Sequence, residues 1–323
     1  MTGDTTPRRS RGPIAWSVVG LLVALLVVAT AGSASAAAQL DKVTVVVIPV
    51  DPAAQVMYAK DRGFFRKQGI DAELKIVADG TQTVPALLSG QAQFAGVPVG
   101  TLAILKSHNA PVKAVAAGAL YRPHIPTTGV YVAPGKRISG ASGLVGKRVN
   151  VDFLNSPAHL GLLRWLDRSG VRQDQVTLST LPFAQAVGPL LRGDFEAAVF
   201  PEPQATLALQ GGARRIALPF DSVCSQDCLG TVYIARSNVD RDLAARFRNA
   251  VQAAAVWANL KRNQAASARI LARYANAKPT LVAKMTRTSY ATRLRPRMAQ
   301  PWLDLYSEYG LLPASYPADN LVK

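Results

Sequence analysis

The sequence predicts an α/β protein of two lobes, each with a mostly parallel sheet flanked by helices. Its 323 residues exceed one ordinary domain and suit two. Hydrophobic residues make up 49% and charged residues 18%, so the chain can bury two cores and lacks the composition of disorder. Short β-branched runs alternate with helical patterns along most of the chain, and this alternation is typical of parallel strands joined by helices.

The first block of alternating elements predicts the first sheet. The run Thr-Val-Val-Val-Ile-Pro over 44–49 is β-branched and ends at a proline, which is typical of a buried strand. A helical pattern follows it over 53–67. The other expected elements of this block are strands over 71–77, 93–95 and 112–117 and helices over 82–88 and 100–107.

A second block begins near Gly146 and repeats the alternation. It predicts strands over 148–153, 176–181 and 196–200 and helices over 157–168 and 185–191. Extended segments over 129–133 and 230–236 flank this block, and residues 241–309 are almost wholly helical in pattern. Two lobes joined by two crossings explain this order most simply. We therefore expect one lobe from 37–130 plus 228–323, and the other from 131–227.

The first 36 residues have the layout of a secretory signal. Arg8, Arg9 and Arg11 precede an apolar run over 14–31, and small residues follow it over 32–38. Cleavage near residue 36 or 38 is expected, and an uncleaved anchor is the alternative because the run approaches the length that spans a bilayer. We therefore expect an exported protein, in the periplasm or outside the cytoplasmic membrane.

The charge of the chain is strongly basic, with 37 Lys and Arg against 20 Asp and Glu and a formal net charge of +17. This balance suggests nucleic-acid binding, but export and the lack of a recognisable binding motif argue against that class. Much of the excess lies between Arg236 and Arg297, interleaved with apolar residues at helical spacing. We expect solvated helix surfaces there, and contact with anionic lipid or a membrane partner is the alternative.

The sequence offers little material for a metal, a cofactor or catalysis. Two Cys and three His are too few for a structural metal site, and we expect no cofactor. Cys224 and Cys228 predict a local disulfide in an oxidising compartment, with two free buried thiols as the alternative. The segment 140–148 lacks the residues of a phosphate-binding loop, and no nucleophile-elbow or zinc-protease motif occurs. We expect no enzymatic activity.

Four segments carry a resemblance to a known family. They are YAKDRGFFRKQGIDAEL at 58–74, ALLSGQAQF at 86–94, LVGKRV at 144–149 and LRGDFEAAV at 191–199. In this order, they resemble the periplasmic substrate-binding proteins of sulfonate, taurine, nitrate and thiamine-precursor importers, the NMT1/THI5-like family. Gln93, where the family often has Asp, and Glu202 depart from the family pattern and bear on the ligand.

The resemblance covers about residues 42–235 and implies a fold, a function and partners. The fold is the two-lobed, hinged solute-binding fold of type II periplasmic binding proteins. The function is capture of a small molecule between the lobes for an ABC importer. The implied partners are a membrane permease and a separate ATPase, and a monomer is expected. A ligand-sensing or adaptor domain on the same fold is the alternative to transport.

The ligand is expected where the carboxyl ends of the strands meet the cleft between the lobes. From the first lobe, this rule selects Asp51, Gln55, Thr81, Gln82 and Tyr121. From the second lobe, it selects Asn155, Ser156, His159, Phe183 and Glu202.

Two of these positions favour different ligands. Ser156, followed by a proline, is a good N-cap, and the helix start behind it offers N–H groups to an anion. Glu202 disfavours a bare anion but can accept hydrogen bonds from an amine or an aminopyrimidine. An ordinary helix cap and a surface ion pair are the respective alternatives. The segment from Ser156 to His159 resembles the family more closely than Glu202 does, and this resemblance favours sulfonate, taurine and nitrate over thiamine-type pyrimidines.

We expect export to remove the N-terminal segment and to leave a mature protein that begins near Ala37 or Gln39. The reason is the succession of basic, apolar and small residues, which is typical of a cleaved signal. N-terminal mass spectrometry of the protein from the periplasmic fraction of a bacterial host checks this. An intact N-terminus on protein retained in the membrane fraction would contradict it.

Overall fold

Two five-stranded sheets organise residues 40–323, which with residues 1–6 are the part of the chain that the computed structural model describes. Leu40–Lys323 form one compact unit. The signal expected over 1–36 lies, from residue 7 onward, outside the described residues. Within the described ranges, the structure contains no helix with the length and apolar character needed to cross a membrane.

The sheet of the first lobe has the strand order β2-β1-β3-β12-β4. Strand β1 runs parallel to both β2 and β3, whereas β12 runs antiparallel to its neighbours β3 and β4. Four strands therefore share one direction, and the strand that returns from the other lobe opposes them. The strands are β1 (Asp41–Val47), β2 (Ile70–Ile76), β3 (Phe94–Pro98), β4 (Val112–Ala117) and β12 (Thr231–Arg236).

The second lobe repeats this plan with the order β10-β6-β9-β7-β8. Here β7 is parallel to β8 and β9, and the strand that enters from the first lobe, β6, is antiparallel to β9 and β10. The predicted two-lobed α/β fold with mostly parallel sheets is confirmed. The strands are β6 (Thr128–Val132), β7 (Arg148–Val151), β8 (Thr177–Thr180), β9 (Ala197–Pro201) and β10 (Arg214–Ala217).

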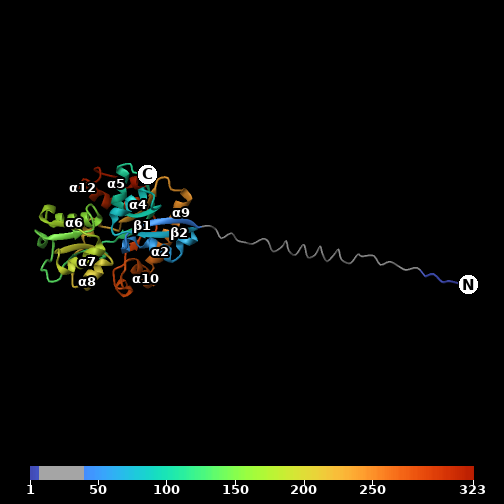
Figure 1. The fold of residues 1–323 in the computed structure, drawn as a ribbon. Coiled ribbons are helices and arrows are strands. Elements are labelled where there is room, and N and C mark those ends of the chain that lie inside the picture. Colours follow the sequence, from blue (N-terminus) through green and yellow to red (C-terminus); the bar gives the residue numbers. More distant parts are fainter. Residues whose placement is uncertain (7–39) are drawn as a thin grey trace. The chain divides into compact units, whose positions relative to one another are not determined.

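Helices cover both sheets, and Figure 1 shows α6, α7 and α8 gathered in the second lobe. The longer helices are α2 (Gln55–Asp61), α4 (Thr83–Leu88), α5 (Val99–Ser107), α6 (Pro157–Arg168), α7 (Phe183–Arg192), α8 (Gln204–Gln210), α9 (Arg241–Asn259), α10 (Gln264–Tyr274) and α12 (Gln300–Glu308). The four-residue helices are α3 (Phe64–Lys67) and α11 (Pro279–Val282). The 3₁₀ helices are η1 (Asp51–Ala53), η2 (Gly80–Gln82), η3 (Ala141–Leu144), η4 (Gln173–Gln175), η5 (Pro219–Ser222), η6 (Lys261–Asn263), η7 (Pro296–Ala299) and η8 (Ala318–Leu321).

Some elements differ from the sequence-based expectation. The single helix expected over 53–67 is interrupted at Gly63, whose φ of +73° is left-handed and incompatible with a continuing α-helix. Helix α8 and strand β10 were not predicted. Neither was a small antiparallel sheet of the order β11-β5-β13, whose strands are β11 (Cys228–Leu229), β5 (Ala119–Tyr121) and β13 (Ser289–Tyr290).

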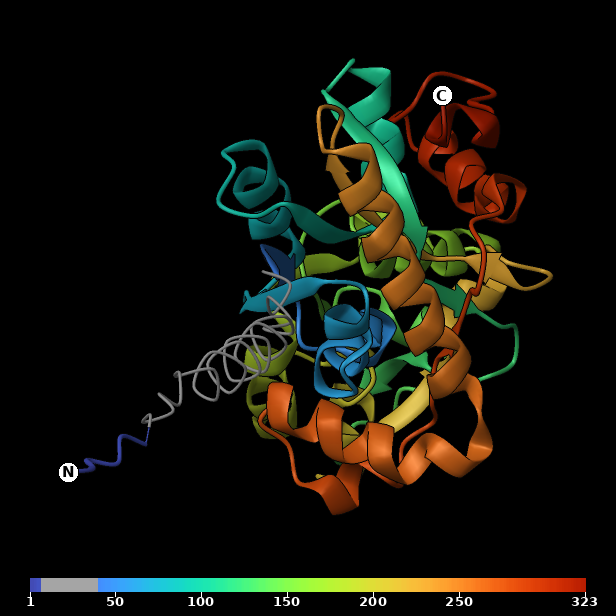
Figure 2. The ribbon, with the colours of Figure 1, turned by 90° about the vertical axis from the view of Figure 1, so that its right-hand side faces the viewer.

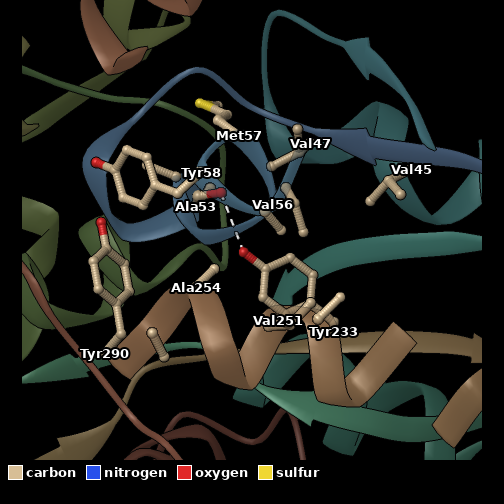
Figure 3. Packing of buried hydrophobic residues seen from close by; sticks show 14 of the residues in the cluster. Val45, Val47, Ala53, Val56, Met57, Tyr58, Tyr233, Val251, Ala254 and Tyr290 are labelled. Carbon is tan, nitrogen blue, oxygen red and sulfur yellow. Dashed lines mark hydrogen bonds between the residues drawn. The ribbon is translucent and has the colours of Figure 1, made fainter. Parts of the chain in front are cut away.

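Alternate residues of β1 face two different cores in the first lobe. Val45 and Val47 lie in the core beneath α2, α9 and α10, while Val46 lies in the core beneath α4, α5 and α12. Figure 2 shows the long orange helix α9 running across the first lobe. On this side, the rings of Phe94 and Phe247 stack with centroids 3.8 Å apart. Tyr233 of β12 contacts η1, where its hydroxyl donates to Ala53 O at 3.2 Å (Figure 3).

The lobes also contact each other away from the crossing strands. The hydroxyl of Tyr306 in α12 donates to the carbonyl oxygen of Asn155 at 3.0 Å, and Arg164 of α6 pairs with Glu308 of α12. On the opposite edge, Asp51 N donates to Glu202 O at 3.0 Å. These contacts join residues of the two lobes.

Residues 219–228 form a compact segment beside the second crossing. Its 3₁₀ turn η5 packs on α6, and a disulfide joins Cys224 to Cys228 in the structure. Both side chains are buried in the core beneath α4, α5 and α12, to which Leu160 and Leu163 of α6 also contribute. The expected disulfide therefore fits the structure, and its formation in the exported protein stays a prediction.

Gly100→Ala should destabilise the protein by about 1–3 kcal/mol, because a Cβ there would lie only 2.2–2.6 Å from ring atoms of Tyr306. Gly188→Ala is the matched control. It is also a helical glycine, but its nearest atom is the flexible end of Arg192 at 3.4 Å. Helix propensity alone should leave this variant as stable as the wild type or more so. Urea denaturation measures both, and equal stability of the two variants would contradict the packing argument.

Candidate functional site

A cavity of about 130 Å³ lies between the two lobes. Its lining comes from both sheets and from the crossing segments. The residues from the first lobe and the small sheet are Ile48, Val50, Pro52, Ala53, Gly96, Val97, Pro98, Ala119, Leu120, Tyr121, Gly230, Thr231, Val232, Tyr233, Thr288 and Trp302. The residues from the second lobe and the adjoining segments are Thr127, Thr128, Asp152, Pro157, Ala158, Phe183, Pro201 and Phe220.

The cavity lies where the parallel strands end. Ile48 follows β1, Pro98 ends β3, Asp152 follows β7 and Pro201 ends β9. In open α/β sheets, ligands bind outside these carboxyl ends because loops there leave the sheet in opposite directions. The sequence predicted this edge of each sheet as the site.

The lining is mostly apolar and aromatic. Its rings belong to Tyr121, Phe183, Phe220, Tyr233 and Trp302. Asp152 is its single acidic residue, and no Lys, Arg or His contributes to it among the residues that the structure describes. Such a surface suits a compact apolar body and offers no cationic side chain to an oxyanion.

Asp152 was not among the residues expected from the sequence. The predicted strand over 148–153 counted it as part of the strand, but β7 ends at Val151 and leaves the carboxyl at the cavity. Its side chain is nearly buried and accepts a hydrogen bond from Ser156 Oγ at 2.5 Å. Burial raises the pKa of Asp152 to about 7. A carboxylate placed one residue after a strand was the signal that could have found it.

Ser156 caps α6 as predicted. Its Oγ accepts from His159 N at 3.1 Å, so one of the free N–H groups at the helix start is already bonded. Because the same hydroxyl donates to Asp152, the protein's own carboxyl lies next to the helix start, where an anionic ligand was expected. Pro157 has no N–H to offer. This helix start is therefore a poorer anion site than the sequence indicated.

His159 and Asn155 interact with each other rather than with the cavity. Asn155 N donates to His159 Nδ1 at 2.9 Å, and burial lowers the pKa of His159 to about 4, so the imidazole is neutral. Asn155 has a left-handed backbone with φ of +64°, and its side chain is exposed. Neither residue belongs to the lining.

Asp51, Gln55 and Glu202 are buried behind the lining. Asp51 forms an ion pair with Arg287 at 3.1 Å, and Gln55 Nε2 donates to Ala117 O at 3.4 Å. The carboxyl of Glu202 accepts from the N–H and the hydroxyl of Thr206 at the start of α8, at 3.0 and 2.9 Å. Burial raises the pKa of Glu202 to about 7.

The four remaining expected residues divide into two pairs. Tyr121 and Phe183 line the cavity, and the hydroxyl of Tyr121 donates to Asp221 at 2.7 Å. Thr81 and Gln82 are exposed in η2, outside the lining. The structure thus brings two of the ten expected residues to the cavity. Ligand contact by the other eight stays untested.

Metal chemistry has no obvious place in the described residues. No group of three or more His, Cys, Asp or Glu side chains is placed to hold an ion within 1–6 and 40–323. The acidic residues near the cavity have protein partners instead, as Asp51 and Glu202 illustrate.

The family model described as "NMT1/THI5 like" matches residues 52–265 of this chain. No curated protein matches it in sequence. Two similar solved structures are described as a ligand binding component and a binding protein. The ligand binding component of an ABC-type import system from Staphylococcus aureus, with zinc bound, has a TM-score of 0.74 at 16% identity, covering 88% of this chain and 96% of its own. The alkanesulfonate-binding protein SsuA from Xanthomonas axonopodis pv. citri, bound to MOPS, has a TM-score of 0.71 at 19% identity, covering 89% and 99%.

Proteins with different described roles have a similar fold. The periplasmic nitrate-binding protein NrtA from Synechocystis PCC 6803 has a TM-score of 0.72 at 17% identity, covering 88% of this chain and 84% of its own. The desulfurization enzyme DSZB has a TM-score of 0.62 at 17% identity, covering 87% and 96%. At these identities the likeness extends to the fold alone, which one enzyme also has.

We expect Asp152 and Glu202 to lower the free energy of unfolding as the pH rises from about 5 to about 8, whereas His159, whose pKa is lowered by burial, acts in the opposite direction. Asp152 and Glu202 have pKa values of about 7 in the folded protein, above the usual values, so the folded state holds protons that the unfolded chain releases. Each carboxyl lowers the free energy of unfolding by up to about 3 kcal/mol between pH 5 and pH 8. Urea denaturation at pH 5 and at pH 8 measures the free energy of unfolding. The change in this free energy between the two pH values should be smaller for Glu202→Gln than for the wild type. The same pH dependence in both proteins would refute the assignment.

Proposed function

The chain belongs to the NMT1/THI5-like family, and from this premise we propose that it is the exported solute-binding component of an ABC importer. In this role it captures a small molecule between its lobes and delivers it to a membrane permease. A separate chain supplies the ATPase, because this sequence lacks a nucleotide-binding motif. The similar ligand binding component of an ABC-type import system supports the proposal at the level of the fold.

One observation carries the proposal: a small cavity at the strand ends has walls from both lobes. Val50 and Val97 of the first lobe and Asp152 and Phe183 of the second lobe all border it. A molecule that contacts both walls binds the closed arrangement more tightly than an open one. Only such differential binding shifts the population towards closure.

The contacts between the lobes give closure a physical basis. Tyr306 with Asn155 and Arg164 with Glu308 join α12 to the second lobe, and Asp51 with Glu202 joins the opposite edge. These bonds link residues of different lobes, so they break when the lobes separate. Ligand binding and these contacts therefore favour the same state.

The cavity limits the size and polarity of the solute. A cavity of about 150 Å³ in another protein binds benzene, so about 130 Å³ suits a molecule of roughly one six-membered ring. The apolar lining and the carboxyl of Asp152 support a ligand without a bare negative charge. Sulfonate, taurine and nitrate, favoured on sequence alone, therefore have less support than an N–H-bearing ring such as an aminopyrimidine.

Mass spectrometry of small molecules released from the purified mature protein tests the proposal. We expect one solute to be released in stoichiometric amount and to rebind to the emptied protein. Small-angle X-ray scattering should then show a smaller radius of gyration on rebinding, because the lobes close. Absence of any released solute, together with no binding of taurine, ethanesulfonate, nitrate or 4-aminopyrimidine, would contradict a solute-binding role.

Tyr306→Phe should weaken binding of the released solute about 2–10-fold, because it removes one hydrogen bond between the lobes and keeps the ring. Tyr274→Phe is the matched control. It removes a hydroxyl that donates to Asp61 at 2.9 Å within the first lobe. Calorimetric titration should show unchanged affinity for the control. Equal weakening of solute binding by the two variants would contradict the proposal that lobe closure connects the Tyr306 hydrogen bond to affinity.

A further inference from the structure

A second recess, of about 440 Å³, lies at the edge of the sheet of the first lobe. Its walls are the end of the edge strand β4 at Ala116 and Ala117, the long helix α9 (Figure 2) and the segment 291–294 that follows β13. No residue lines both this recess and the cavity between the lobes. The recess is therefore a separate candidate site.

The charged side chains of the recess are two arginines, Arg248 of α9 and Arg293, and no Asp or Glu lines it among the residues that the structure describes. Neither guanidinium takes part in any of the ion pairs formed within residues 1–6 and 40–323. Arg246, on the same helix, differs because it pairs with both Asp41 and Asp242. The recess thus presents two positive charges that no carboxylate of the described chain neutralises.

Neutral donors lie beside the two arginines. Gln252 follows Arg248 by four residues, so both side chains project from one face of α9 and line the recess. Thr292 is exposed, and its hydroxyl can donate a hydrogen bond. The N–H of Ala291 donates to Gly118 O at 2.9 Å, whereas the next three N–H groups have no backbone acceptor in the described part of the chain. Phosphate oxygens accept hydrogen bonds from donors of all these kinds.

The size and charge of the recess indicate which anion it suits. A cavity of about 150 Å³ in another protein binds benzene, so about 440 Å³ has room for a phosphate group with a small organic group attached. Guanidinium groups bind phosphate through two parallel hydrogen bonds, which a lysine cannot form. Two of them suit a phosphate ester better than a carboxylate or a neutral solute.

We propose that Arg248 and Arg293, with Gln252 and Thr292, form a binding site for a phosphate ester that carries a small polar organic group. Soluble phosphate monoesters and the glycerophosphate headgroups of anionic lipids share this chemistry. The inference goes beyond the proposed solute-binding function, because the site lies outside the cavity between the lobes and requires no closure.

Calorimetric titration of the mature protein with glycerol 3-phosphate tests the site. The titration is run at pH 8 and low ionic strength, where salt screens exposed charges least. We expect Arg248→Gln and Arg293→Gln each to weaken binding about 5–20-fold, because each removes charge-assisted hydrogen bonds. Glycerol, which lacks the phosphate, should not bind.

Arg269→Gln is the matched control. Arg269 is exposed on α10, forms no ion pair within the described residues and lies outside the recess, so this variant loses the same charge. Its affinity for glycerol 3-phosphate should equal that of the wild type. All three arginines are exposed, so we expect the variants to fold, and circular dichroism checks this.

A labelling measurement on the wild type does not depend on any variant. Phenylglyoxal modifies exposed arginines, and peptide mass spectrometry gives the extent of modification at each position. Saturating glycerol 3-phosphate should protect Arg248 and Arg293 and leave the modification of Arg269 unchanged.

Vesicles distinguish a lipid headgroup from a soluble phosphate ester. If the headgroup is the source, the mature protein sediments with phosphatidylglycerol vesicles but not with phosphatidylcholine vesicles, and the double variant Arg248→Gln/Arg293→Gln loses this binding. If a soluble ester is the source, glycerol 3-phosphate binds and the vesicles do not retain the protein.

Three results would overturn the inference. They are equal weakening by Arg269→Gln, unprotected Arg248 and Arg293 under saturating glycerol 3-phosphate, and binding to neither glycerol 3-phosphate nor phosphatidylglycerol vesicles. None of them affects the proposed function, whose test is the solute released from the cavity between the lobes.

Discussion

The surroundings of the cavity depend on one buried carboxylate, that of Asp51, which begins η1 after the first strand. Its oxygens accept from the guanidinium of Arg287 at 3.1 Å, from the N–H of Thr288 at 2.6 Å and from the hydroxyl of Tyr290 at 3.1 Å. It thereby joins segments 236 positions apart. Its own N–H donates to Glu202 O in the second lobe. Breaking a buried ion pair of this kind typically costs about 3–5 kcal/mol, because the remaining charge has no partner.

This anchor also determines what the cavity lining contains. The segment that it fixes brings Thr288 to the wall, and Tyr290 continues into the small sheet that carries Tyr121. Figure 3 shows Tyr58 and Tyr290 beside each other at this edge of the first core. Because the charges of Asp51 and Arg287 satisfy each other behind the wall, the wall itself stays apolar. Asp152 is then the one acidic group that the lining retains among the described residues.

Much of the fold could be predicted because its signals are local. Helix α6 begins and ends where the pattern of Ser156, Pro157 and the following leucines placed it, since a cap, a proline and one apolar face act within one helix. The strands alternate with helices as expected. The missed elements are short or depend on distant partners, as β13 depends on pairing with β5. Gly63 interrupts the expected helix because its left-handed backbone cannot continue an α-helix, and apolar periodicity does not report backbone conformation.

The sequence by itself determined the class of fold, the family and the edge of each sheet where we propose that a ligand binds, because composition, the alternation of strands and helices, and short motifs are properties of contiguous segments. Only the tertiary structure decided which side chains meet there. Asp51 and Glu202 turned to partners inside the protein, while Asp152, Thr288 and Trp302 came to the lining from three separate segments. The physical reason is that a side chain's direction, and its choice between an internal partner and a ligand, depends on neighbours that are distant in the chain.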